Sequence, residues 1–220
     1  MICPKCGFEQ DHTRGECARC GIVFAKYRQP RGAAAAGEPA PEDAPPEKVG
    51  TARFLEDLLF HVEPAVNPLY FGGRALLFLI ILIWGWMFIL SPMESNAVGR
   101  SFWHLVNLPF HEAGHLIFRP FGRFMTSLGG SLGQLLMPLV CLVVLLLSTR
   151  DPLGSSISLW WFGENFMDLA PYINDARAGR LPLLGGNTGR SAPYGFHDWE
   201  FILNESGILK YDHTLAKISY

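Results

Sequence analysis

The sequence predicts a mainly α-helical membrane protein, a polytopic bundle of about four transmembrane helices with a small N-terminal zinc ribbon. The 220 residues are 49% hydrophobic and only 17% charged, whereas soluble domains carry about 25% charged residues. Residues 124–149 contain no charged residue, and four of the five cysteines form two Cys-x-x-Cys pairs near the N-terminus. This pattern excludes a disordered chain and an ordinary one-core soluble domain, and the net charge of −2 argues against nucleic-acid binding.

The first 28 residues carry the two cysteine pairs, and each pair is followed by a glycine. Zinc takes four thiolates in a tetrahedron, and a segment this short cannot build a sufficient core without a metal. We therefore expect one structural Zn²⁺ and a reducing compartment. The segment is similar to the short zinc ribbons at the N-termini of many bacterial proteins. Its mixed charge favours a cytosolic protein partner over nucleic acid. The predicted ligands are Cys3, Cys6, Cys17 and Cys20.

Residues 29–50 hold five prolines and a run of four alanines, which predicts a linker. Residues 51–63 place Phe54, Leu55, Leu58, Leu59 and Val62 on one helical face. Thr51 is the expected N-cap and Pro64 the expected stop. Such a helix lies on a membrane surface or packs on the rest of the protein, and the sequence leaves both open.

Four segments are candidate membrane spans: 75–93, 101–118, 124–149 and 152–173. If all four cross, the segments on the side of the N-terminus carry 16 Lys and Arg residues and the opposite loops carry 2. The positive-inside rule then places the N-terminus and the ribbon in the cytoplasm. The membrane that we expect is a bacterial inner membrane. The chain is predicted to have four parts: a ribbon (1–28), a linker (29–50), a membrane domain of metalloprotease type (51–180) and a cytosolic C-terminal segment (181–220).

The segment His111-Glu112-Ala113-Gly114-His115 fits the HExxH pattern. On a helix, positions i and i+4 share one face, so the two imidazoles can bind one zinc ion. Glu112 can then act as the base for the metal-activated water. Ionisable groups inside an apolar span are costly and are functional by default. His104, seven residues before His111, is expected to be a satisfied or outer-sphere histidine rather than a ligand.

A catalytic zinc usually has three protein ligands, so the sequence must supply one more. Glu164 is one candidate, because Glu164 and Asp168 have the ExxxD spacing of gluzincins. Asp168 itself is a second candidate and Asp175 a third. The charge count places Asp175 on the same side as the end of the HExxH helix, which favours it. For Asp198, and for His197 before it, the sequence favours a helix cap over a contact with the site.

Residues 100–180 resemble the site-2 protease group of intramembrane zinc metalloproteases. The resemblance rests on HExxH in a membrane helix, the glycine-rich LGGSLGQLLMP that follows it, and a proline before an aspartate. It implies a third ligand at Asp175, four residues after Pro171. Asp175 differs from the group because its neighbours are Asn174 and Ala176 rather than Leu and Gly.

The sequence therefore predicts an intramembrane zinc metalloprotease that cleaves a membrane-embedded or membrane-proximal peptide segment. Glu112 is the expected catalytic base, and His111, His115 and Asp175 are the expected ligands of a catalytic Zn²⁺. Its expected partners are a membrane-protein substrate, the lipid bilayer and a cytosolic protein bound by the ribbon. The alternatives are a non-catalytic membrane scaffold with a structural zinc site and a gluzincin-type membrane protease that uses Glu164.

Overall fold

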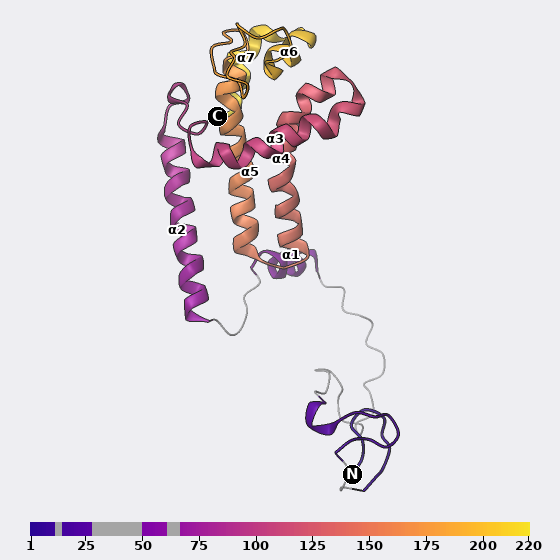
Figure 1. Ribbon diagram of the computed structural model, residues 1–220. Helices are drawn as coiled ribbons and strands as arrows, with labels where there is room; N and C mark the ends of the chain where they lie inside the picture. Colours follow the sequence, from indigo (N-terminus) through magenta and orange to yellow (C-terminus); the bar gives the residue numbers. More distant parts are fainter. Residues whose placement is uncertain (12–14, 28–49, 61–66) are drawn as a thin grey trace. The chain divides into compact units, whose positions relative to one another are not determined.

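The computed structural model describes residues 1–11, 15–27, 50–60 and 67–220. It divides into two compact units, Met1–Lys48 and Val49–Tyr220. Both units are drawn in Figure 1. The predicted linker falls almost entirely on residues 28–49, and the predicted helix stop at Pro64 falls on residues 61–66, so both predictions lie outside the described residues.

The first unit contains two equivalent hairpin turns, one for each cysteine pair. In the first turn, Cys3 donates its backbone N–H to Phe8 and Gly7 donates to Cys3. In the second, Cys17 donates to Ile22 and Gly21 donates to Cys17. The two glycines have φ values of 69° and 70°, a left-handed conformation that side chains rarely adopt. The repeated Cys-x-x-Cys-Gly sequence therefore builds the same turn twice.

The second unit is helical, and the described residues of the chain contain no strand beyond three isolated β-bridges. Short 3-10 turns lie before, between and beside the α-helices. The elements, in chain order, are η1 (Phe24–Lys26, in the first unit), α1 (Thr51–Leu59), α2 (Pro68–Leu90), η2 (Met93–Ser95), α3 (Phe102–Phe118), η3 (Arg119–Phe121), α4 (Arg123–Leu147), α5 (Pro152–Asn174), α6 (Asp198–Glu205), η4 (Leu209–Tyr211) and α7 (Asp212–Ser219). The N-cap of α1 is Gly50 rather than the predicted Thr51, which is the first helical residue.

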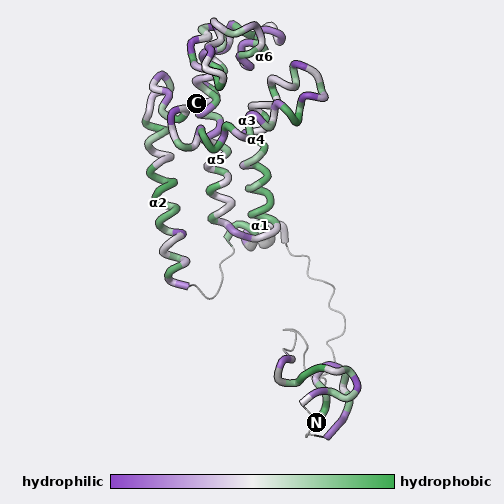
Figure 2. Tube along the Cα trace, viewed as in Figure 1, coloured by the Kyte–Doolittle hydropathy of each residue, from purple (hydrophilic) through white to green (hydrophobic). Residues whose placement is uncertain are grey.

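Helices α2 and α4 are long and apolar enough to cross a membrane. Only 11% of the most apolar stretch of α2 is buried, and most of its exposed side chains from Leu76 onward are large and hydrophobic. Figure 2 shows mainly hydrophobic colour along α2, with hydrophilic colour in the part where the helix starts. A soluble surface rarely exposes so large an apolar area, so α2 is suited to a lipid environment.

Helix α3 carries the HExxH segment and packs along the first half of α4, while the second half of α4 packs against α5. Figure 1 shows α3 running across the direction of α2 and α5, and α4 bending between its two halves. Pro138 lies inside α4 and cannot donate to the carbonyl four residues earlier, which is a common cause of such a bend. The predicted spans 101–118 and 152–173 are both helical, but α3 does not run parallel to the others.

Two contacts show which segments of the second unit lie at the same end of the helices. Arg74, near the start of α2, forms an ion pair with Asp151, in the loop between α4 and α5. Tyr220 donates its hydroxyl to the carbonyl of Ser91, which follows α2, at 2.5 Å. Four alternating crossings would separate Arg74 from Asp151 and Ser91 from Tyr220 by the membrane. Both contacts favour another arrangement than the predicted four crossings, and of the four predicted spans the described residues form two helices long and apolar enough to cross a membrane, α2 and α4.

The buried hydrophobic core lies at the end of the second unit that carries Ser91 and Tyr220. It joins η2 to the C-terminal half of α5 and to α6 and α7. Its buried members are Met93, Leu169, Ala170, Ile173, Ala176, Leu203 and Ala216. This core fixes α6 over the ends of α4 and α5, and so places the first residue of α6 next to α3.

Candidate metal centre

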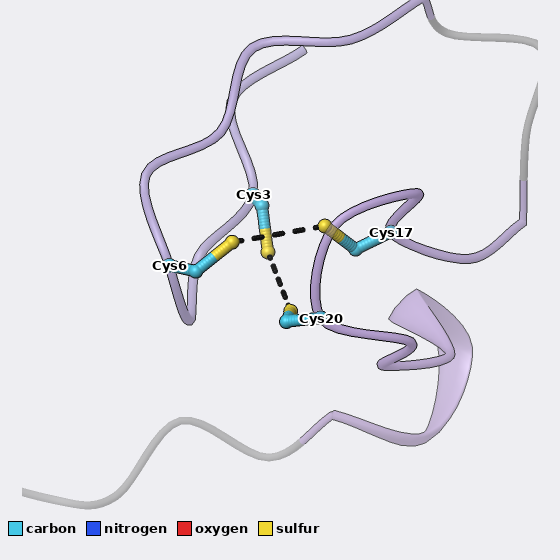
Figure 3. Close-up of side chains that lie close together, drawn as sticks. All are labelled: Cys3, Cys6, Cys17 and Cys20. Atoms are coloured by element: carbon cyan, nitrogen blue, oxygen red, sulfur yellow. Dashed lines mark hydrogen bonds between the residues drawn. The ribbon is translucent and has the colours of Figure 1, made fainter.

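Four thiols of the first unit converge on one point (Figure 3). The Sγ atoms of Cys3 and Cys20 are 3.7 Å apart, and so are those of Cys6 and Cys17. A tetrahedral zinc site with Zn–S bonds of about 2.3 Å places neighbouring sulfurs about 3.8 Å apart. The predicted cysteine cluster is therefore assembled in a geometry that could hold a metal ion.

The local environment favours a thiolate at Cys17. Burial raises the pKa of its thiol, but the backbone N–H groups of Cys20 and Arg19 and the thiols of Cys3 and Cys20 lower that pKa further, to about 6. Metal binding needs the thiolate. In the same turn the backbone N–H of Ile22 lowers the pKa of Cys20, but burial and the neighbouring thiols raise that pKa to about 12, so Cys17 is the thiol of this turn that ionises first.

A second cluster lies in the helical unit. His111 and His115 are one turn apart on α3, and their ring centroids are 4.8 Å apart. Asp198, the first residue of α6, places Oδ2 at 3.2 Å from Nε2 of His111 and at 3.4 Å from Nε2 of His115. Tetrahedral ligands with bonds of about 2.0–2.1 Å lie about 3.3 Å from one another. The three side chains could therefore hold one metal ion.

Hydrogen bonds on the far side of each imidazole set its orientation. His115 donates its Nδ1–H to the carbonyl of Thr126 at 2.8 Å, because a carbonyl can only accept. His111 places Nδ1 at 2.7 Å from Oε1 of Gln134, which likewise accepts. Both imidazoles then present the lone pair of Nε2 to the carboxylate of Asp198. Two lone pairs and an anionic oxygen that face one another make a site for a cation.

Glycines of α4 allow the two imidazoles to pack against that helix. A Cβ at Gly130 would lie 2.5 Å from Nε2 of His111 and 2.7 Å from Nε2 of His115. Backbone contacts between α3 and α4 are equally close, since a Cβ at Gly114 would lie 2.0 Å from the carbonyl oxygen of Gly129. The glycines of the LGGSLG segment therefore let α3 and α4 pack closely, and Gly130 faces the nitrogen atoms that could bind a metal ion.

The position of Asp198 is set by its neighbours. His197 is fully buried and caps α6, accepting the N–H of Glu200 at Nδ1. Tyr172 accepts the backbone N–H of Asp198 at 2.9 Å and donates to its Oδ2 at 3.3 Å. Asp198 is therefore held with Oδ2 toward Nε2 of both imidazoles.

Glu112 is exposed and lines a cavity of about 800 Å³ together with His111, His115 and Asp198. A second cavity, of about 560 Å³, is lined by His115 and Asp198 from another side. The candidate metal centre is thus open to two spaces. The cavity of about 800 Å³ is also lined by Glu112, the residue that the HExxH pattern predicts to be the base.

The structure places Asp175, the predicted third ligand, in a different role. Asp175 ends α5, and its two carboxylate oxygens accept the backbone N–H groups of Arg180 at 2.9 Å and Leu181 at 2.8 Å. It closes the turn after α5 and is not a member of the His111, His115 and Asp198 group. The proline before Asp175 suggested a ligand, whereas both of its carboxylate oxygens accept N–H groups of the turn after α5.

Glu164 and Asp168 are also outside the metal-ligating group. Asn107 donates its Nδ2 hydrogens to Glu164 and to Asp168, each at 3.0 Å. Asp168 also accepts from Nδ1 of His104 at 2.9 Å. These two carboxylates therefore form a separate buried network with His104. His104 is thus not among the candidate ligands, as predicted, and its Nδ1 is bonded to Asp168, which lies outside the His111, His115 and Asp198 group.

Asp198 is the member of the candidate site for which the sequence favoured another role. Its signal was the pair His197-Asp198 at the start of a short amphipathic segment, for which a helix cap was favoured. The structure divides the two roles, because His197 caps the helix and Asp198 reaches the site.

The chain has no significant match among protein-family models, curated proteins or solved structures. The candidate site therefore rests on its own geometry.

Proposed function

We propose that this protein is an intramembrane zinc metalloprotease. The observation that carries the proposal is the convergence of His111, His115 and Asp198 beside Glu112 at the edge of a large cavity. An HExxH helix with a third ligand from a distant segment is the donor set that hydrolytic zinc centres use. The four-cysteine module of the first unit would carry a second, structural zinc ion as a zinc ribbon and would bind a protein partner.

The membrane arrangement that we propose has three crossings, by α2, the second half of α4 and α5. The Arg74–Asp151 pair and the Tyr220–Ser91 hydrogen bond support it, because each joins segments that three crossings leave on one side. The hairpin of α3 with the first half of α4 would then lie within or beside the bilayer without spanning it. A substrate segment that is embedded in the membrane or lies close to it would enter the cavity beside Glu112.

Each residue of the site has a defined part in the proposed reaction. When bound, zinc would supply Lewis-acid chemistry and make water nucleophilic at neutral pH. The Glu112 carboxylate would accept the proton of the attacking water and later donate it to the leaving amine. Gln134 and the carbonyl of Thr126 hold the imidazoles of His111 and His115 with Nε2 toward Asp198. Tyr172 holds the Asp198 carboxylate.

The decisive experiment compares the full-length protein with its Glu112→Gln variant on a proteome-derived peptide mixture in detergent. New N-termini are identified by mass spectrometry, and zinc is measured in each protein. We expect cleavage by the wild type, none by Glu112→Gln, and equal zinc in both. Glu56→Gln, an exposed carboxylate on α1, is the matched control and should cleave as the wild type does. Undiminished cleavage by Glu112→Gln would contradict the proposed mechanism.

The scaffold alternative makes a different prediction about coordination. It requires a fourth protein ligand and therefore a closed metal site, whereas a hydrolytic site keeps one position open. X-ray absorption spectroscopy on a variant without the four-cysteine cluster distinguishes the two. A closed shell, together with no cleavage by the wild type, would favour the scaffold.

A further inference from the structure

A third imidazole, that of His104, lines the cavity beside the candidate metal centre. His104 lies on α3, seven residues before His111, and both line the cavity of about 800 Å³. Seven residues correspond to two helical turns and a rise of about 10 Å. His104 and His111 therefore occupy one face of one helix at separate points along the same cavity.

A chain of hydrogen bonds that ends at Nδ1 holds the imidazole of His104 in place. Trp161 donates its Nε1–H to Oδ1 of Asn107 at 2.7 Å. Asn107 donates to Oδ2 of Asp168 at 3.0 Å, and both oxygens of Asp168 accept from Nδ1 of His104, at 2.9 and 3.1 Å. This chain of hydrogen bonds joins α5 to α3, and Asn107 also donates to Glu164.

Asp168 and His104 are buried to very different extents. The side chain of Asp168 is 3% exposed, whereas that of His104 is 39% exposed. Within residues 67–220, no hydrogen bond reaches Nε2 of His104, so this nitrogen remains for a ligand in the cavity. An ionisable side chain within an apolar helical segment costs free energy, so its presence there indicates a function.

We propose that His104 binds the main chain of the substrate segment about three residues from the bond to be cleaved, and that Asp168 is its positioning residue. An extended peptide advances about 3.3 Å per residue, so three residues span the rise of about 10 Å between His104 and His111. A peptide main chain offers both an N–H and a carbonyl to Nε2. This inference rests on the proposed function, because it assumes that a peptide occupies the metal cavity.

The test uses hydroxamates as zinc-chelating probes of the full-length, zinc-loaded protein. Acetohydroxamate reaches only the metal. Two series of four-residue peptidyl hydroxamates extend from the chelating group in either chain direction. We expect one peptidyl series to bind the wild type more tightly than acetohydroxamate. His104→Ala should weaken that series about 5- to 10-fold and leave acetohydroxamate binding and zinc content unchanged. Asp168→Asn should act in the same direction, and His104→Gln should restore part of the affinity.

The outcomes separate this inference from the proposed function. If no hydroxamate binds in a zinc-dependent way, the proposed open zinc centre is wrong. If acetohydroxamate binds but neither peptidyl series gains affinity, or if His104→Ala leaves the gain intact, the inference about His104 is overturned and the metal centre stands. His213→Ala, an exposed histidine bonded to Asn174, is the control and should leave every affinity unchanged.

Discussion

His111 and Asp198 are 87 positions apart in the chain, yet Nε2 of the first and Oδ2 of the second are 3.2 Å apart. The helix α3 supplies two nitrogen donors by local geometry alone. The oxygen donor depends on the docking of α6, which the core around Leu203 and Ala216 secures. The candidate metal centre is therefore a tertiary feature, and any change that releases α6 should cost metal affinity.

The identity of the third ligand can be tested by metal content. We expect the full-length protein to bind two zinc ions per chain, one at each cluster. Asp198→Ala should reduce this to one, because it removes the only oxygen donor of the His111, His115 and Asp198 group. Asp175→Asn should retain two, since Asp175 serves the turn after α5. Zinc per chain after dialysis against a weak chelator measures both. Loss of zinc from Asp175→Asn with retention in Asp198→Ala would reverse the assignment.

A methyl group at Gly130 should disturb the metal centre without touching a ligand. The new Cβ would lie 2.5 Å from Nε2 of His111, so the imidazoles must shift. We expect Gly130→Ala to weaken zinc affinity about 10- to 100-fold, the range seen when outer-shell support is lost. Gly163→Ala is the matched control, because its Cβ would meet nothing within 4 Å. Competition with a fluorescent zinc chelator gives the affinities, and equal values for both variants would contradict the prediction.

The three-crossing arrangement predicts which loops share a side of the membrane. Glu94→Cys and Lys217→Cys should react with a membrane-impermeant maleimide from the same side, and Thr149→Cys from the opposite side. Right-side-out and inside-out vesicles, with labelling at each residue read by peptide mass spectrometry, give the result. Four alternating crossings would instead place residues 94 and 149 together, apart from residue 217.

The docking of α7 should depend on pH through Asp212. The Asp212 carboxylate is fully buried and accepts Nε of Arg177 at 2.8 Å from each oxygen. Burial raises the pKa of Asp212, but the hydrogen bond from Arg177 and the N–H of His213 lower it below its usual value. The stabilising contribution is therefore complete above the usual pKa of about 4 and is lost as the pH falls through the lower pKa of the folded state.

Arg177→Met removes the group that lowers this pKa. We expect the variant to unfold at a lower temperature than the wild type at pH 7, and the difference to shrink as the pH falls below about 4. Lys217→Met, an exposed base on α7, is the control and should change little. A difference between Arg177→Met and the wild type that does not vary with pH would show that packing, not charge, sets the effect.

Local patterns in the sequence predicted the parts of the molecule that local geometry builds. The spacing of Cys3, Cys6, Cys17 and Cys20 predicted two matching turns that bring the thiols together. The spacing of His111 and His115 predicted one helical face. Each of these depends on residues within a few turns of one another.

Features set by long-range contacts were predicted less well. Asp198 reaches the site through a core that only the folded chain defines, so its sequence position favoured a cap. The topology prediction assumed that α3 crosses the membrane. In the proposed three-crossing arrangement, the Lys and Arg residues from residue 51 onward would divide into eight at the end that carries Ser91 and three at the end that carries Asp151. The cytoplasmic N-terminus stays a prediction.

The separation of the ligands along the chain also sets when the centre can form. At roughly 5–20 residues per second, synthesis of the 87 positions from His111 to Asp198 takes on the order of 4–17 s. During that interval the nascent chain carries two imidazoles and no third donor. If the protein is a protease, its activity is withheld until α2 to α5 have been made. A newly inserting chain then cannot cut its own helices or those of neighbouring chains that are still unpacked.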